Sequence, residues 1–563
     1  ADRRYGFISG ACQESVRSSV ELRHTRSDRV DAVVTHGALG LVIFLALMYG
    51  VFYLTFTVGQ PLMELIEALF GHLADLVAGF WPDGADSPLK SLLIDGVIGG
   101  VGGVLVFLPN IVLLFAAIAF LEDSGYMARG AFIMDRLMHK IGLHGKSFIP
   151  MLIGFGCTVP AIMATRVLES RRDRLVTMLV LPLISCGARL PIYSLIIPAF
   201  FAPRLRAPML LVIYVIGIVL AIVGVKLLRT LVFKGESEPF VMELPPYRMP
   251  TVKGVFIHTW ERASAYLKKA GTIILAFSVL MWALATYPRK THLERDYDAE
   301  LVRVDAARDA SLVDLNSALG LPPDSPLLLQ DDLGETAAVP PQVVRFVHLR
   351  QTVEAARRRF DDAVADEAAE AGSPRYIALQ THHFGELHRL QQAAPEVYPL
   401  VARYLDEVDR PHEEQVRRIQ AARAAELLAA SLVGRLGRLL EPMLKPLGFD
   451  WKIGTALIGA VAGKELFVAQ MGIVYAVGEA DSSSEALRAQ LRRNYSPLTG
   501  FCIMLFCLVS MPCVATFAVT ARESGRLRWA VLQAASLTVM AYALTLAAYQ
   551  IGTLLGLGTT SVG

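Results

Sequence analysis

The feature that most constrains this chain is a series of apolar blocks long enough to cross a lipid bilayer. A spanning helix needs about 20 mostly apolar residues, because the hydrocarbon core is about 30 Å thick. A composition of 54% hydrophobic and 19% charged residues agrees with such a series. We therefore predict an all-α polytopic membrane protein. The predicted spans are 35–58, 92–121, 175–201, 208–231, 269–287, 452–477 and 527–556.

Charge and composition divide the chain into further parts. Residues 1–34 are polar and arginine-rich, which predicts a cytoplasmic lead-in, because positive charge near a span stays inside. Residues 288–430 are rich in Ala, Arg, Asp and Glu, which predicts a soluble, mostly helical insert whose side and role stay open. The first membrane half is then 35–287 and the second is 431–563. Residues 61–80 have apolar positions at helical spacing, which predicts a separate amphipathic helix at the outer surface.

The charge balance and the cysteine pattern argue against several classes of protein. A net charge of +2 favours neither nucleic acid nor an acidic partner. The six cysteines contain no C-x-x-C pair, so they predict neither a disulfide framework nor a zinc finger. The stretch "KIGLHGKS" (140–147) resembles a phosphate loop but has Lys140 where that loop requires Gly. We expect a bilayer-embedded protein that is not an enzyme and has no nucleotide site.

Residues 147–165 are apolar but are interrupted by Gly154, Gly156 and Pro160. Both flanks are basic, so the simplest topology is a re-entrant segment that enters the membrane and returns to the same side. Non-helical backbone survives at membrane depth only where protein or water covers its amides. If residues 147–165 and the later segment 498–519 cross fully instead, the repeats described next become inverted.

The two membrane halves contain an internal repeat. Repeated units with interrupted helices are how many transporters build a site at the membrane centre. The sequence therefore predicts two gate repeats that surround a central path. The matching elements are 98–107 with 458–467, and the pair Cys157 and Arg166 with the equally spaced pair Cys513 and Arg522.

Three cysteines, Cys157, Cys186 and Cys513, stand beside Gly or Pro at predicted helix interruptions. A thiolate is a soft ligand that suits a late first-row metal, so these residues are candidate metal ligands. The alternative is that each cysteine is a small hydrophobic residue that fills a tight turn. Cys502 and Cys507 lie in an unbroken apolar stretch, where packing is the expected role. The candidate gate backbone residues are Gly154, Gly156, Pro160 and Pro512.

Carboxylates near or inside predicted spans are the other candidates. A carboxylate at bilayer depth costs ~2.5–3.5 kcal/mol on insertion scales, so such residues usually have a function. Glu122 and Asp123 end a predicted span, where the alternative role is an interfacial cap. Glu465 lies inside another span, where the alternative is a pair with Lys464. Adjacent helical side chains point apart, so that pair is geometrically poor.

Several long motifs, in order, resemble the membrane domain of the FeoB family of bacterial ferrous-iron transporters. The resemblance covers nearly all of 35–287 and 445–540. The motifs that carry it are "LLIDGVIGGVGGVLVFLPNIVLLF", "LEDSGYMARGAFIMDRLM", "GLHGKSFIPMLIGFGCTVPAIMATR", "SCGARLPIY", "DWKIGTALIGAVAGKELFV" and "MPCVATFAVTARESG".

The resemblance implies Fe²⁺ uptake across the bacterial inner membrane, with Fe²⁺ as the transported substrate. Family members usually carry an N-terminal GTPase domain, so GTP and Mg²⁺ are implied for that domain and not for this chain. That domain and small cytosolic accessory proteins are the implied partners, and a homo-oligomer is compatible with the resemblance. Thr158 stands where the family commonly has Asn, which weakens that position as a ligand. The implied metal path contains Cys157, Cys186, Cys513, Glu122 and Glu465.

Other functions stay open at this point. The same gate architecture could pass another divalent metal or a nucleoside-like small solute, with the thiols merely packing. An organic solute needs aromatic stacking and amide hydrogen bonds, whereas the repeat centre offers Gly, Pro, Cys and Glu. A membrane scaffold without transport does not account for interrupted helices in apolar segments.

Overall fold

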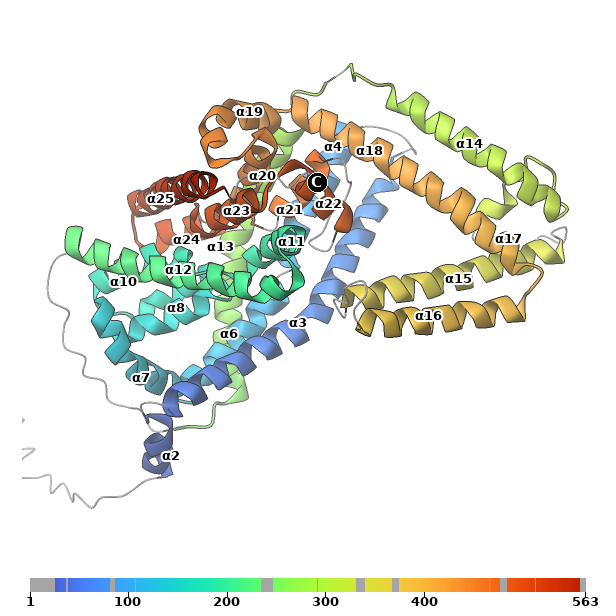
Figure 1. Ribbon diagram of the computed structural model, residues 1–563. Helices are drawn as coiled ribbons and strands as arrows, with labels where there is room; N and C mark the ends of the chain where they lie inside the picture. The colour runs from blue at the N-terminus through green and yellow to red at the C-terminus, as the bar shows by residue number, and fades with distance from the viewer. Residues whose placement is uncertain are drawn as a thin grey trace, which may run out of the picture. The chain divides into compact units, whose positions relative to one another are not determined.

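The computed structural model is all-helical over the residues it describes, which confirms the predicted fold class (Figure 1). It forms two compact units that interleave along the chain. Unit 1 comprises Ala1–Gly187, Tyr214–Val279 and Val514–Ser536, and unit 2 comprises Ala188–Ile213, Leu280–Cys513 and Leu537–Gly563. The described residues are 26–36, 39–81, 87–106, 108–233, 247–290, 292–330, 340–366, 374–464, 466–475, 484–511 and 513–556.

Unit 1 contains most of the first gate repeat. Short 3-10 or π turns are labelled η. Its elements are α2 (Arg26–Val34), α3 (Leu39–Ala78), α4 (Pro88–Ser91), η1 (Leu92–Ile98), α5 (Gly99–Leu105), α6 (Leu108–Asp123), α7 (Tyr126–Ile141), η2 (Gly145–Ser147), α8 (Phe148–Gly154), α9 (Thr158–Ala164), η3 (Thr165–Val167), α10 (Arg171–Val180), η4 (Leu181–Leu183) and α24 (Val514–Glu523).

Unit 2 contains the charged helices of the middle of the chain and most of the second repeat. Its elements are α11 (Leu190–Phe200), α14 (Tyr297–Ala318), η6 (Pro326–Leu329), α15 (Pro341–Asp366), α16 (Pro374–Ala393), α17 (Tyr398–Arg403), η7 (Tyr404–Asp409), α18 (Arg410–Ala430), α19 (Leu432–Leu444), η8 (Lys445–Leu447), α20 (Trp451–Ala462), α21 (Leu466–Val474), α22 (Glu485–Asn494) and α23 (Pro497–Val509). The elements with residues in both units are η5 (Gly187–Arg189), α12 (Pro203–Leu231), α13 (Val252–Thr286) and α25 (Leu527–Leu554).

Among the described residues, five helical segments are long and apolar enough to span a membrane, or six if one bent pair is counted. Exposed side chains of α12 are apolar at every fourth position, which gives the helix a face suited to lipid. This face consists of Leu211, Val215, Val219, Val223 and Leu227. The five segments are Val42–Ala78, Arg171–Phe200, Pro203–Leu231, Pro497–Glu523 and Leu527–Leu554.

Two sequence expectations about the helices are wrong. The separate amphipathic helix at 61–80 does not exist, because α3 runs without interruption through Pro61. Proline removes one backbone donor but does not break a helix whose neighbouring turns remain bonded. The predicted span 452–477 is not one helix either, since α20 ends at Ala462 and α21 begins at Leu466.

The interruption predicted in 147–165 is present as two short helices. α8 and α9 have 7 residues each, about 10 Å, which is too short to cross a bilayer. The two helices pack against each other, so the chain folds back on itself after the break. This geometry agrees with a re-entrant segment.

The helices between α13 and α19 build a core of their own. α15 lies beside α16 and α14 beside α18 (Figure 1). Buried apolar residues from 312 to 408 fill the space between them. The two ends of this region meet, because Leu432 N donates to Tyr287 O at 2.8 Å. The Glu426 carboxylate connects the same two ends, because it accepts hydrogen bonds from Lys290 Nζ at 2.8 Å and from the Tyr297 hydroxyl at 2.9 Å.

Candidate functional site

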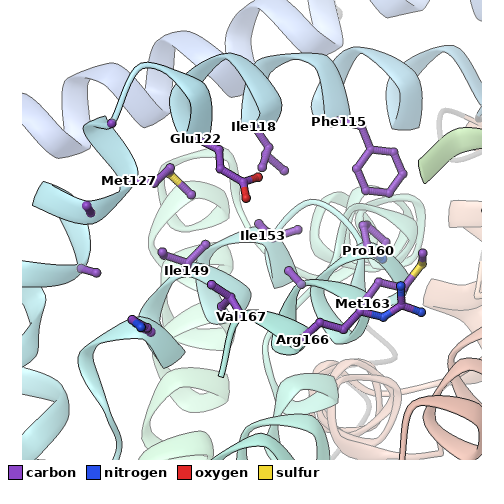
Figure 2. A pocket seen from close by; sticks show the side chains of 15 residues that line it. Phe115, Ile118, Glu122, Met127, Ile149, Ile153, Pro160, Met163, Arg166 and Val167 are labelled. Atoms are coloured by element: carbon purple, nitrogen blue, oxygen red, sulfur yellow. The ribbon is translucent and has the colours of Figure 1, made fainter. Parts of the chain in front are cut away.

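A cavity of about 480 Å³ lies inside unit 1 between α6, α7, α8 and α9. Figure 2 shows the Glu122 side chain pointing from α6 into this cavity, with Pro160 and Met163 across from it. Glu122 is exposed and Pro160 is buried, so the cavity runs from an accessible rim to a buried wall. Its lining residues are Phe115, Ile118, Glu122, Gly125, Met127, Ala128, Ala131, Lys146, Ile149, Ile153, Pro160, Met163, Ala164, Arg166 and Val167.

One wall of the cavity is made by a sharp bend between α6 and α7. The two helices meet at 83°, and Gly125 stands at the bend with φ 82°. Only glycine adopts this left-handed conformation without strain, so "EDSGY" bends here instead of continuing the helix. Gly125 N donates to Glu122 O at 3.0 Å, which closes the last turn of α6 and fixes Glu122 at the rim.

The opposite wall is the α8–α9 hairpin. Cys157 caps α9 with an extended backbone, φ −151° and ψ 132°. Pro160 lies in the first turn of α9, where no helical partner exists for its missing N–H. Gly154 packs closely on η4, because an added Cβ would lie 3.3 Å from the Leu181 side chain. Of these three residues, Pro160 is the one that lines the cavity.

The two cationic side chains at the cavity edge, Lys146 and Arg166, form ion pairs with carboxylates. Lys146 Nζ lies 2.9 Å from a Glu169 carboxylate oxygen. Arg166 donates through Nε to Glu523 at 2.8 Å, and Arg174 Nη2 donates to the same carboxylate at 2.8 Å. Glu523 belongs to α24, which packs on α9, so the segments after the two predicted repeat cysteines meet within unit 1.

The cavity lining limits what the site can bind. Most of it is apolar, and Glu122 is the one acidic side chain among the lining residues. Met127 and Met163 add thioether sulfurs, which are soft ligands. Within the described part of the chain, no three His, Cys, Asp or Glu side chains converge on one metal position.

Helix interruptions occur at each of the three candidate cysteines. Cys157 and Cys186 lie in loops of unit 1 that are joined, because Gly187 N donates to Gly156 O at 3.0 Å. Cys513 lies between the end of α23 and the start of α24. The cysteines are half-buried at all three positions. Glu465 and Pro512 lie outside the described residues, so the ligand roles of the whole set stay predictions.

Two side chains of the cavity lining, Met127 and Met163, were not among the residues predicted from the sequence. Met127 stands in "SGYMAR" and Met163 in "VPAIMATR", both inside motifs quoted above. Their position in these motifs was the available signal. Methionine is common in cores, so its presence alone does not mark a site.

A buried ion pair beside the cavity was not predicted from the sequence. Arg129 of α7 is 1% exposed and donates to both carboxylate oxygens of Asp31, at 2.9 Å and 3.0 Å. It also donates to Gly125 O at 3.0 Å and stacks on the Tyr247 ring at 4.1 Å. One side chain thus ties α2 to the bend that forms the cavity wall.

This ion pair predicts a pH-dependent contribution to stability. Hydrogen bonding from Arg129 holds the pKa of Asp31 below its usual range. A lowered carboxyl pKa stabilises the fold above the unfolded pKa of about 3.9, and that stability is lost as the pH falls through the folded value. Asp31→Asn should therefore lower the melting temperature at pH 7, by the equivalent of about 1–2 kcal/mol. The gap to the wild type should begin to narrow below about pH 4 and close as the pH falls through the lowered pKa of Asp31. A gap that stays constant down to pH 3 would contradict this assignment.

Two family models match the sequence. The Gate family, described as nucleoside recognition, matches residues 104–200 and 421–527. The family described as ferrous iron transport protein B C terminus matches residues 210–262. The double Gate match supports the internal repeat. No solved structure matches the chain.

Curated relatives cover almost the whole chain. A Porphyromonas gingivalis protein, the Fe(2+) transport protein A/Fe(2+) transporter FeoB fusion protein, is 38% identical over 98% of this chain and 55% of its own length. The Fe(2+) transporter FeoB of Helicobacter pylori strain J99 is 32% identical over 95% of this chain and 67% of its own length. The Fe(2+) transporter FeoB of Methanocaldococcus jannaschii is 31% identical over 98% of this chain and 63% of its own length. The chain therefore spans about half to two thirds of the length of these relatives.

Proposed function

Because this chain belongs to the FeoB family of Fe²⁺ transporters, we propose that it forms the membrane path for Fe²⁺ uptake across the bacterial inner membrane. The observation that carries the proposal is the Glu122 carboxylate, which faces a cavity between a bent helix pair and a folded-back hairpin. Interrupted helices around such a site are the usual construction of transporters. The multi-pass architecture supports the same role.

The cavity chemistry suits transit of a divalent cation. A transported ion must bind well enough to enter and weakly enough to leave. One carboxylate and two thioethers in an apolar lining provide a weak, mixed hard and soft site. In this mechanism Glu122 attracts the ion at the rim. Cys157, Cys186 and Cys513 are the proposed thiol ligands at helix interruptions, and Glu465 is a proposed further source of negative charge.

The cavity does not favour a nucleoside, although the Gate description names nucleoside recognition. Nucleoside binding uses aromatic stacking and amide hydrogen bonds. Phe115 is the one aromatic side chain among the lining residues, and these residues include no Asn or Gln. Among divalent metals, Fe²⁺ is proposed from the printed names of the relatives.

Two partners follow from the family. The Porphyromonas relative joins an Fe(2+) transport protein A to the transporter in one chain, so a separate protein of that kind is a proposed partner here. The relatives are longer than this chain, and the resemblance implies that a GTP-binding domain in the parent protein controls transport. GTP and Mg²⁺ would act in that domain.

Uptake by liposomes that contain the purified chain tests the proposed function. Fe²⁺, kept reduced, should enter faster than Mn²⁺ or Zn²⁺. Glu122→Gln should raise the KM for Fe²⁺ about fivefold, since the lost attraction is worth about 1 kcal/mol. Glu64→Gln, at an exposed position on α3 outside the cavity lining, is the matched control and should leave KM unchanged. No Fe²⁺ entry above that of empty liposomes would overturn the proposal, and equal KM values for the two variants would remove Glu122 from the path.

A further inference from the structure

A buried lysine occupies the point where two broken helices of the second repeat meet. Lys464 is 4% exposed and directly follows Gly463, the C-terminal cap of α20. Its Nζ donates to Ser510 Oγ at 3.0 Å. Ser510 is itself buried and is the C-terminal cap of α23, just before the interruption that contains Cys513. One ammonium group therefore links two interruptions within unit 2.

The surroundings of this ammonium favour positive charge. The last turns of an α-helix carry carbonyl oxygens without helical partners, and the helix dipole places partial negative charge there. Gly463 leaves the helix with an extended backbone, φ −153° and ψ 138°, so the chain turns away directly after the end of α20. In transporters, such half-helix C-termini coordinate cations. The lysine thus occupies a position that would also suit a metal ion.

The charge of Lys464 makes joint occupancy by an ion unfavourable. Its ammonium belongs to a side chain that is 4% exposed, and at low dielectric like charges repel strongly. A divalent cation can therefore enter this position only after the Lys464 ammonium has left it.

The repeat shows that the lysine is not required by the local fold. In the alignment of 98–107 with 458–467, Val104 stands opposite Lys464. A neutral side chain therefore serves at the corresponding position of the first repeat. The charge is a feature of the second repeat alone, which points to a role beyond packing.

We propose that Lys464 is a tethered cation that fills an ion position between α20 and α23 and must be displaced when a transported ion passes. In this role the lysine competes with the ion from within the protein, and it sets the ion affinity of the second repeat. The identity of the ion as Fe²⁺ rests on the proposed function. The displaced ammonium would leave its Ser510 partner and become more accessible.

Neutral substitutions of Lys464 distinguish a role as a competing charge from a role as a structural hydrogen-bond donor. Lys464→Met removes both the charge and the donor, whereas Lys464→Gln removes the charge and keeps a donor for Ser510. Both variants should lower the KM for Fe²⁺ uptake about fivefold, because a competing occupant no longer reduces the fraction of sites open to the ion. Lys464→Arg keeps the charge and should not lower KM. Melting temperatures measured in parallel identify any variant that fails to fold.

A purely structural lysine gives a different pattern. In that case Lys464→Met and Ser510→Ala would lose stability together, Lys464→Gln would resemble the wild type, and KM would not fall in any variant. That result would overturn the tethered-cation role while the proposed Fe²⁺ uptake still held.

A second readout does not depend on transport. Amine modification of Lys464 by a small permeant imidate, followed by mass spectrometry, should be slow in the wild type without metal and several-fold faster with Fe²⁺. An increase without any uptake would support the tethered cation while contradicting the proposed transport function. An unchanged modification rate would overturn the displacement.

Discussion

The Cys157→Ser substitution should reduce Fe²⁺ uptake roughly 10- to 100-fold, the range typical for disturbing a metal site. Serine has nearly the size of cysteine but replaces a soft thiolate ligand by a hard, mostly protonated hydroxyl. Cys157 is half-buried at the interruption of the α8–α9 hairpin, three residues before Pro160, which lines the cavity. A loss of transport at unchanged melting temperature would therefore identify a ligand and not a packing residue.

The matched control for this prediction is Cys502→Ser. Cys502 is fully buried within the continuous helix α23, where packing is the expected role of its thiol. Cys507 is the less suitable control, because it lies one turn before Ser510, the hydrogen-bond partner of Lys464. If Cys157→Ser and Cys502→Ser take up Fe²⁺ equally at matched protein levels, Cys157 is a small residue that lets the hairpin pack.

Glu523→Gln should destabilise unit 1 by about 2–3 kcal/mol, because it removes charge-assisted hydrogen bonds to two arginines. The Glu523 side chain is 5% exposed, and it joins α24 to Arg166 and Arg174 beside the α8–α9 hairpin. The two guanidinium groups are 53% and 28% exposed, so water compensates part of the loss. The effect should therefore stay below that of breaking a fully buried pair, about 3–5 kcal/mol.

A melting curve of the purified protein measures this effect, and Glu169→Gln is its control. Glu169 pairs with Lys146 at 2.9 Å but is 88% exposed, so solvent screening should leave its pair with little effect on stability. Equal shifts of the melting temperature for the two variants would show that Glu523 does not hold α24 in place.

Local sequence signals predicted the helix interruptions well. Gly156, Pro160 and their neighbours act over a few residues, so the break at Cys157 follows from backbone chemistry that the sequence displays directly. Pro61 was a misleading signal, because α3 continues through this proline with its neighbouring turns intact. The break after Ala462 was not predicted, since Gly463 was the only local signal for it.

Contacts between distant segments were beyond the sequence. Arg129 and Asp31 are 98 residues apart, and nothing in either motif names the other as a partner. The repeat spacing matches Arg166 and Arg522 as equivalent positions, but it does not indicate that Arg166 forms an ion pair with Glu523, the residue after Arg522. The cavity itself depends on how α6 and α7 meet the α8–α9 hairpin, so its lining could be named only in part, through Glu122 and Pro160.

The interleaving of the two units has a consequence for biosynthesis. Unit 1 begins with the first residues of the chain but is completed by Val514–Ser536, which provides α24 and its Glu523 contact to Arg166. At roughly 5–20 residues per second, translation delivers this segment only tens of seconds after the α8–α9 hairpin has entered the membrane. Until then the surface of α9 that receives α24 has no partner from its own unit. Nascent chains that stop inside unit 2 would expose this surface of α9. The exposed surface would distinguish them from the finished protein for the membrane quality-control machinery.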